Sequence, residues 1–154
     1  RKKIPVDQYL NSLNVVPVSI SYEKDPNDLL KAKELYLTDL NQKYTKDRKE
    51  DMESISDGIT GDKGDVHLSI GKIINFESDS YDDCSNQITK TIKDSYKLHP
   101  TNYAAAIIQG KDNPNDSNDL DKIDDAIQYL ENRIKLLPEE MQSYLLNQYS
   151  NPVL

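Results

Sequence analysis

The sequence is poor in the residue types that build disulfides, metal centres and membrane spans. Its 154 residues include one Cys, two His, one Phe and no Trp. The single Cys84 excludes a disulfide within the chain and favours a reducing compartment. No apolar run approaches the ~20 residues that a transmembrane helix needs, and no signal-peptide pattern opens the chain. We therefore expect a cytoplasmic protein.

Basic residues are also scarce relative to acidic ones. There are 19 Lys and Arg against 27 Asp and Glu, which gives a formal net charge of −8. Nonspecific nucleic-acid binding depends on Lys and Arg side chains that neutralise phosphates. The acidic balance therefore argues against nucleic acid as a partner.

The spacing of possible ligands argues against a metal site. Neither His67 nor His99 lies two, three or four residues from another His or Cys, the usual spacing of a structural zinc site. The Asp-rich stretch over residues 112–125 lacks the Gly and the bidentate Glu of an EF-hand loop. Cys84 lies on the apolar stripe of a predicted helix, where acidic neighbours oppose a thiolate, so we interpret it as a packing residue. We expect no metal, no bound cofactor and no catalytic set.

Two stretches, residues 15–22 and 66–70, alternate with the period of a half-buried strand. The apolar face of the first strand carries Val16, Val18, Ile20 and Tyr22, and the opposite face carries Ser19 and Ser21. Pro17 has no N–H to donate to a neighbouring strand. It therefore predicts a strand start, an edge or a bulge at this point.

Apolar residues spaced three or four apart predict helices in most of the remaining chain. Asp25 at the N-cap, Pro26 at the first helical position and Asp28 at the third give a strong start signal for a helix whose apolar stripe continues to Tyr44. Gly58 is placed to end a short helix over 48–57. Further helices are predicted over 82–96, 103–108, 119–137 and from Pro138 onwards, with a weak pattern over 1–13 and an exposed loop at 111–119. The fold class is therefore α/β or α+β: a partial sheet of a few strands clad by helices, with a helical C-terminal part.

Three stretches resemble one family. "VVPVSISYEKDPNDLLKAKELY" (15–36), "GITGDKGDVHLSIGK" (58–72) and "YKLHPTNYAA" (96–105) are similar, in this order, to blocks of a bacterial branch of the glycerolipid acyltransferases. These are enzymes of the lysophosphatidate and glycerol-3-phosphate acyltransferase type. Asn27 departs from the branch, which often carries Cys there, and so do Asp62 and Asp65. The resemblance implies an acyltransferase-like α/β domain over 1–110 and a helical tail over 111–154.

The resemblance also implies a chemistry of phospholipid biosynthesis. The family transfers an acyl group from a coenzyme A or acyl-carrier-protein thioester to a glycerol-phosphate hydroxyl such as that of lysophosphatidate. A His held by an Asp in an H-x-x-x-x-D motif takes the hydroxyl proton, and an E-G-x-R block binds phosphate. Such an enzyme can contact the inner membrane peripherally, which stays an open alternative to a purely cytoplasmic location.

Neither motif occurs in this chain. His67 is followed five residues later by Lys72, His99 is followed by Ala104, and no Glu-Gly pair is present. Both motifs normally precede the first block, yet thirteen residues precede Asn14. We therefore expect the C-terminal half of an O-acyltransferase of the 1-acylglycerol-3-phosphate type. By this interpretation the parent protein is an enzyme, and this chain alone carries no catalytic residue and is inactive.

The resemblance implies four residues that line the substrate cleft: Pro17, Val18, Tyr22 and Glu23. In this interpretation the first strand continues a sheet begun by the preceding half. The alternative, that the four residues only build the strand and its turn, stays open.

A second hypothesis belongs to a different class, a noncatalytic interaction domain. The helix over 119–137 and the last helix would dock a partner or a second copy. An unpaired strand edge recruits other chains, so self-association is expected under this hypothesis.

Overall fold

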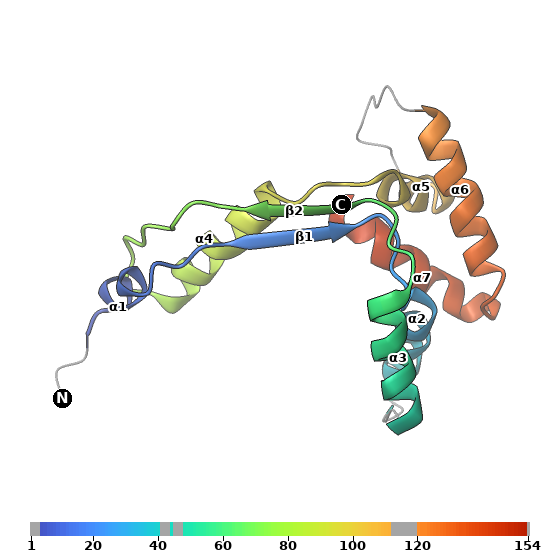
Figure 1. The fold of residues 1–154 in the computed structure, drawn as a ribbon, viewed down its shortest axis with the longest axis horizontal. Helices are drawn as coiled ribbons and strands as arrows, with labels where there is room; N and C mark the ends of the chain where they lie inside the picture. Colours follow the sequence, from blue (N-terminus) through green and yellow to red (C-terminus); the bar gives the residue numbers. More distant parts are fainter. Residues whose placement is uncertain (1–3, 41–43, 45–47, 112–119, 154) are drawn as a thin grey trace. The chain divides into compact units, whose positions relative to one another are not determined.

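The computed structural model describes residues 4–40, 44, 48–111 and 120–153. The chain is mainly helical and has a small two-stranded antiparallel sheet, which agrees with the α+β form of the predicted fold class (Figure 1). Contacts group it into two compact units, residues 1–21 with 66–97 and residues 22–65 with 98–154. Each unit contains segments from both halves of the sequence. Most of the loop predicted at 111–119 lies outside the described residues.

The elements follow the predicted order with shifted boundaries. Along the described residues they are α1 Val6–Ser12, β1 Val18–Tyr22, α2 Asp28–Asp39, α3 Arg48–Thr60, β2 Val66–Ile70, α4 Tyr81–Asp94, α5 Pro100–Ile108, α6 Leu120–Ile134, α7 Glu139–Ser150 and the 3-10 turn η1 Asn151–Val153.

Several helix boundaries were predicted wrongly. The helix predicted over 103–108 begins at Pro100, and the helix predicted to reach Tyr44 ends at Asp39. The second helix begins at Asp28 instead of Pro26, because the Asp25 carboxylate accepts the Asn27 N–H at 2.9 Å and holds a turn first. Gly58 does not end the next helix, which continues to Thr60. The Gly61 N–H still donates to the Asp57 carbonyl at 2.8 Å, so the helical bonding pattern runs through Gly58.

In the first unit, β1 and β2 form a ribbon that continues beyond the strand ends. Gly71 N–H donates to the Pro17 carbonyl, and Ile74 N–H donates to the Val15 carbonyl, both at 2.9 Å. Pro17 lies immediately before β1. It uses its carbonyl in the pairing, so its missing N–H costs nothing, and the predicted strand start is confirmed.

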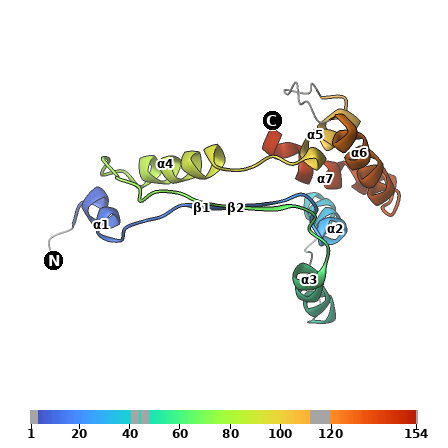
Figure 2. The same ribbon diagram turned by 45° about the horizontal axis from the view of Figure 1, so that its top comes forward.

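The ribbon buries its serine face, although the apolar face of a half-buried strand is normally the inner one. Ser19 and Ser21 are 3% and 1% exposed, whereas Val18 and Ile20 are 50% and 47% exposed. The expectation of an apolar inner face is therefore wrong. The Ser19 hydroxyl donates at 3.0 Å to the carbonyl of Ser95, the residue that ends α4. Figure 2 shows α4 on one side of the ribbon, and this hydrogen bond identifies that side as the serine face.

A small core joins the N-terminal segment of this unit to α4. Ile74, Phe76 and Cys84 are buried, with Val6, Leu10, Val15 and Ile88 packed against them. The Asn11 side chain donates to the Phe76 carbonyl at 2.9 Å and accepts the Phe76 N–H at 2.8 Å. Burial, and then the nearby Asp83 carboxylate, raise the pKa of the Cys84 thiol. The prediction that Cys84 is a packing residue is confirmed.

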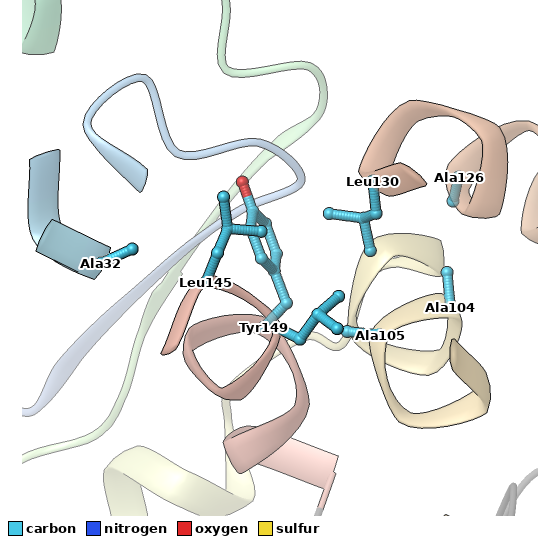
Figure 3. Packing of buried hydrophobic residues seen from close by; sticks show 8 residues of the cluster. Ala32, Ala104, Ala105, Ala126, Leu130, Leu145 and Tyr149 are labelled. Carbon is cyan, nitrogen blue, oxygen red and sulfur yellow. The ribbon is translucent and has the colours of Figure 1, made fainter. Parts of the chain in front are cut away.

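The second unit has the larger core, in which α2, α5, α6 and α7 meet around small side chains. Figure 3 shows Leu130 of α6 and Leu145 and Tyr149 of α7 next to alanines of α2, α5 and α6. The fully buried residues include Ala32, Ala104, Ala105, Leu130 and Leu145, each 0% exposed. Alanine on facing helices allows their backbones to approach closely, so the leucines fill the space between them.

We expect Leu130→Ala to lower the free energy of unfolding by about 2–5 kcal/mol, because it leaves a cavity among rigidly packed helices. Leu136→Ala is the matched control, since Leu136 is 65% exposed, and its cost should stay within about 0.5 kcal/mol. Urea unfolding followed by tyrosine fluorescence measures both. Equal costs for the two variants would contradict this description of the core.

Candidate functional site

The four residues implied by the resemblance occupy three different environments. Pro17 is buried beside Gly71, where a Cβ on the glycine would lie 2.8 Å from the proline ring. Val18 and Tyr22 lie on the exposed side of the ribbon, at 50% and 38% exposure. Glu23 follows directly and is half-buried. Val18 and Tyr22 thus share a face, while Glu23 is the member that lines a cavity.

Glu23 is the junction of three distant segments. Its N–H donates to the Asp65 carbonyl at 2.9 Å, and its carboxylate accepts the Asp65 N–H at 2.9 Å. The Thr101 hydroxyl donates to the Glu23 carbonyl at 2.5 Å. Gly64 has a positive φ of 58°, and a Cβ there would lie 2.3 Å from the Glu23 carboxylate. Hydrogen bonds to Glu23 therefore hold the turn between α3 and β2 in place.

A cavity of about 280 Å³ opens beside this junction. It is lined by Glu23, Lys24, Thr101, Lys122, Asp125, Ala126 and Tyr129. The two carboxylates balance the two ammonium groups, so the lining creates no strong net field. It offers hydrogen bonds and ion pairs but neither an imidazole nor a thiol. This lining can hold a small polar ligand, and it does not include the histidine that the resemblance would lead one to expect as the general base.

Lys24 separates this cavity from a second one, also of about 280 Å³, that Asp62 and Arg133 help to line. The Lys24 ammonium lies 5.2 Å from the centre of the Tyr129 ring and 2.9 Å from the Asp62 carboxylate. The hydrogen bond from Lys24 lowers the pKa of Asp62, and the same bond raises the pKa of Lys24. The Lys24 ammonium therefore already contacts two protein groups, the Tyr129 ring and the Asp62 carboxylate.

A buried carboxylate holds the helices around these cavities in place. Asp28 is 0% exposed and accepts from Arg133 Nε at 3.2 Å, with a second bond from Arg133 Nη2. The Tyr149 hydroxyl donates to Asp28 at 3.0 Å and accepts the Asp25 N–H at 2.9 Å. The bond to Asp28 raises the pKa of Arg133. One carboxylate thus ties α2 to α6 and α7.

The sequence contains a signal for Arg133 that the resemblance did not use. Arg133 lies three residues after Leu130 and one before Ile134, within the apolar stripe of α6. A charged residue on such a stripe needs a buried partner of opposite charge. Asp28 was identified only as a helix-start residue, and this pairing was missed.

We expect Gly64→Ala to destabilise the protein more than Gly110→Ala. Both glycines have positive φ, 58° and 69°, so both substitutions carry backbone strain of about 1–2 kcal/mol. Only Gly64 has a neighbour in the way, since nothing lies within 4 Å of the Cβ position at Gly110. Displacing the Glu23 carboxylate adds about 1.5–3 kcal/mol. Urea unfolding measures the difference, and equal costs would argue against the junction.

We also expect alkaline pH to destabilise the protein through Tyr149. Burial, and then the Asp28 carboxylate, raise the pKa of Tyr149. Its contribution to stability is complete below the unfolded phenol pKa of about 10 and is lost as the pH rises above it. Above that pH the free energy of unfolding should fall with pH in both proteins. The fall should be less steep in Tyr149→Phe than in the wild type, by about 1.4 kcal/mol per pH unit. Tyr81→Phe, at a side chain 67% exposed, should keep the wild-type slope. An unchanged slope in Tyr149→Phe would refute the assignment.

Comparison with protein-family models, with curated proteins and with solved structures finds no match. Among the described residues, no helix combines the length and the apolar character that crossing a bilayer demands. The assignment of a function therefore rests on the residues and the geometry of this chain.

Proposed function

We propose that this chain is the C-terminal portion of a bacterial glycerolipid acyltransferase of phospholipid biosynthesis. The parent enzyme moves an acyl group from a coenzyme A or carrier-protein thioester to a glycerol-phosphate hydroxyl, as in lysophosphatidate. The observation that carries this proposal is the junction at Glu23. All three stretches that resemble the family contribute a residue to it: Glu23, Asp65 and Thr101.

The distances along the chain make this convergence informative. Glu23 lies 42 positions from Asp65 and 78 positions from Thr101, yet direct hydrogen bonds join it to both. Segments that resemble one family by chance have no reason to meet at one residue. Their meeting beside a polar cavity supports the view that the three stretches resemble the family together and not by chance.

In this proposal the chain shapes the cleft and leaves the proton transfer to another segment. The Glu23 turn forms one wall, and the imidazole that takes the hydroxyl proton belongs to the preceding part of the enzyme. The lining of the cavity at Glu23 fits this division, because it contains charged and hydroxyl groups without a histidine. The isolated chain is then a noncatalytic part of the enzyme.

The coding sequence upstream tests the proposal most simply. It should encode a His-x-x-x-x-Asp motif roughly a hundred residues before Val15. The protein expressed from the full reading frame should release thiol from an acyl-thioester with lysophosphatidate as acceptor, and the 154-residue chain should not. Absence of the motif, or turnover by the chain alone, would overturn the proposal.

A matched pair of variants in the full-length protein tests the junction. Thr101→Val removes the bond to the Glu23 carbonyl and should lower kcat/KM about tenfold or more, because displacement of a cleft wall misplaces the substrate. Thr91→Val removes a hydroxyl that bonds only within α4 and should leave the rate unchanged. Equal effects would show that the Glu23 junction has no special role in the reaction.

A noncatalytic interaction domain is a second candidate, and one observation favours it. The apolar side of the ribbon is exposed along both strands. Soluble monomers rarely leave a contiguous apolar face uncovered unless a partner binds there.

A further inference from the structure

The exposed side of the ribbon is apolar throughout. We call it the ribbon face: Val18, Ile20, Tyr22, Val66, Leu68 and Ile70, which are 38–68% exposed. The ten residues of β1 and β2 include no Asp, Glu, Lys or Arg. Natural edge strands commonly carry charges that prevent pairing with other chains, and this ribbon has none.

Helix α3 presents a second uncovered apolar surface. Met52, Ile55 and Ile59, which we call the α3 stripe, share one side of the helix and are 62%, 52% and 74% exposed. The helix has no buried residue. An amphipathic helix gains most of its stability by packing its apolar stripe, so this stripe also needs a partner.

The two surfaces are complementary in kind and in size. A five-residue strand is about 17 Å long, and the 13 residues of α3 span about 20 Å. Helices characteristically pack over the faces of sheets, and α4 already covers the serine side of this ribbon (Figure 2). A helix over the ribbon face would complete a three-layer arrangement.

We infer that the occupant of the ribbon face is the α3 stripe of a second copy of this chain. The contact is reciprocal: α3 of each copy packs on the ribbon face of the other, in a closed twofold dimer. This inference deepens the interaction-domain function proposed above and does not depend on the acyltransferase assignment.

The buried area is large enough for a specific dimer. A fully exposed aliphatic side chain offers roughly 100 Å² of apolar surface. With the exposures of the nine residues concerned, each copy would bury roughly 500 Å², and the dimer about 1,000 Å² before any polar atom is counted. Specific interfaces begin at about 1,000 Å² in total.

The charge of the chain predicts how the dimer responds to salt. Each copy carries a formal net charge of −8, while the ribbon face carries none. Repulsion between copies therefore acts through solvent outside the contact, where salt screens it. Raising the salt concentration from about 0.1 to 1 M should strengthen dimerisation.

Sedimentation velocity across the micromolar range tests the inference with three variants. Leu68→Lys on the ribbon face and Ile55→Lys on the α3 stripe should each weaken dimerisation roughly tenfold or more. Leu136→Lys, at a residue 65% exposed and outside both surfaces, should dimerise like the wild type. Circular dichroism and the thermal midpoint show whether each variant stays folded.

Mixing the two defective variants gives the decisive result. Each variant alone has one lysine in both of its contacts. A mixed dimer pairs the intact stripe of Leu68→Lys with the intact ribbon face of Ile55→Lys and confines both lysines to the other contact, so the mixture should associate more strongly than either variant alone. If Ile55→Lys dimerises normally, ribbons pack on ribbons and the inference is wrong. A wild type that stays monomeric also overturns the inference. If that monomer floats with phosphatidylcholine vesicles, a lipid surface and not a second copy covers the ribbon face. The acyltransferase proposal survives all of these outcomes.

Discussion

The hydrogen bond between the Ser19 hydroxyl and the Ser95 carbonyl fixes which side of the ribbon faces inward. Its length of 3.0 Å places the end of α4 against the serines of β1. The apolar side chains of both strands must then point the other way, because successive residues of a strand alternate between its faces. The uncovered ribbon face follows from this constraint, and so does the need for something to cover it. Either proposed cover, a second copy or another part of a larger enzyme, would bury the same six side chains.

The existence of the elements could be predicted because each depends on local periodicity. The alternation over 15–22 and 66–70 and the three-to-four spacing elsewhere predicted the α-helices and both strands of the described residues, but not the 3-10 turn Asn151–Val153. Which face of the ribbon is inside depends on where α4 ends, and Ser95 lies 76 residues from Ser19. Periodicity carries no such information, so the hydrophobic rule chose the wrong face. The start of α2 was misplaced for a local reason, since the Asp25 carboxylate stabilises a turn as readily as a helix cap.

The candidate site was predictable in part. Glu23 came from resemblance, and the structure places it where the three stretches meet. Its partners could not be predicted from the sequence. These hydrogen bonds use the backbone N–H and C=O groups of Glu23 and Asp65, and every residue type except proline carries the same two groups. Arg133 was different: a lone cation on an apolar helical stripe signals a buried anion, and Asp28 is that anion. The buried pair positions α2, α6 and α7, and thereby the cavities beside Lys24 and Tyr129.

Thiol labelling at two adjacent positions tests the orientation of the ribbon most directly. In a Cys84→Ala background, which removes the only native thiol, Ile20→Cys and Ser21→Cys place a reporter on opposite faces of β1. At a dilution where the chain is monomeric, Ile20→Cys should react with a soluble disulfide reagent almost as fast as in urea. Ser21→Cys should react at least about a hundredfold more slowly, because the folded ribbon must open first. Slow labelling at position 20 with fast labelling at position 21 would contradict the orientation and everything built on the ribbon face.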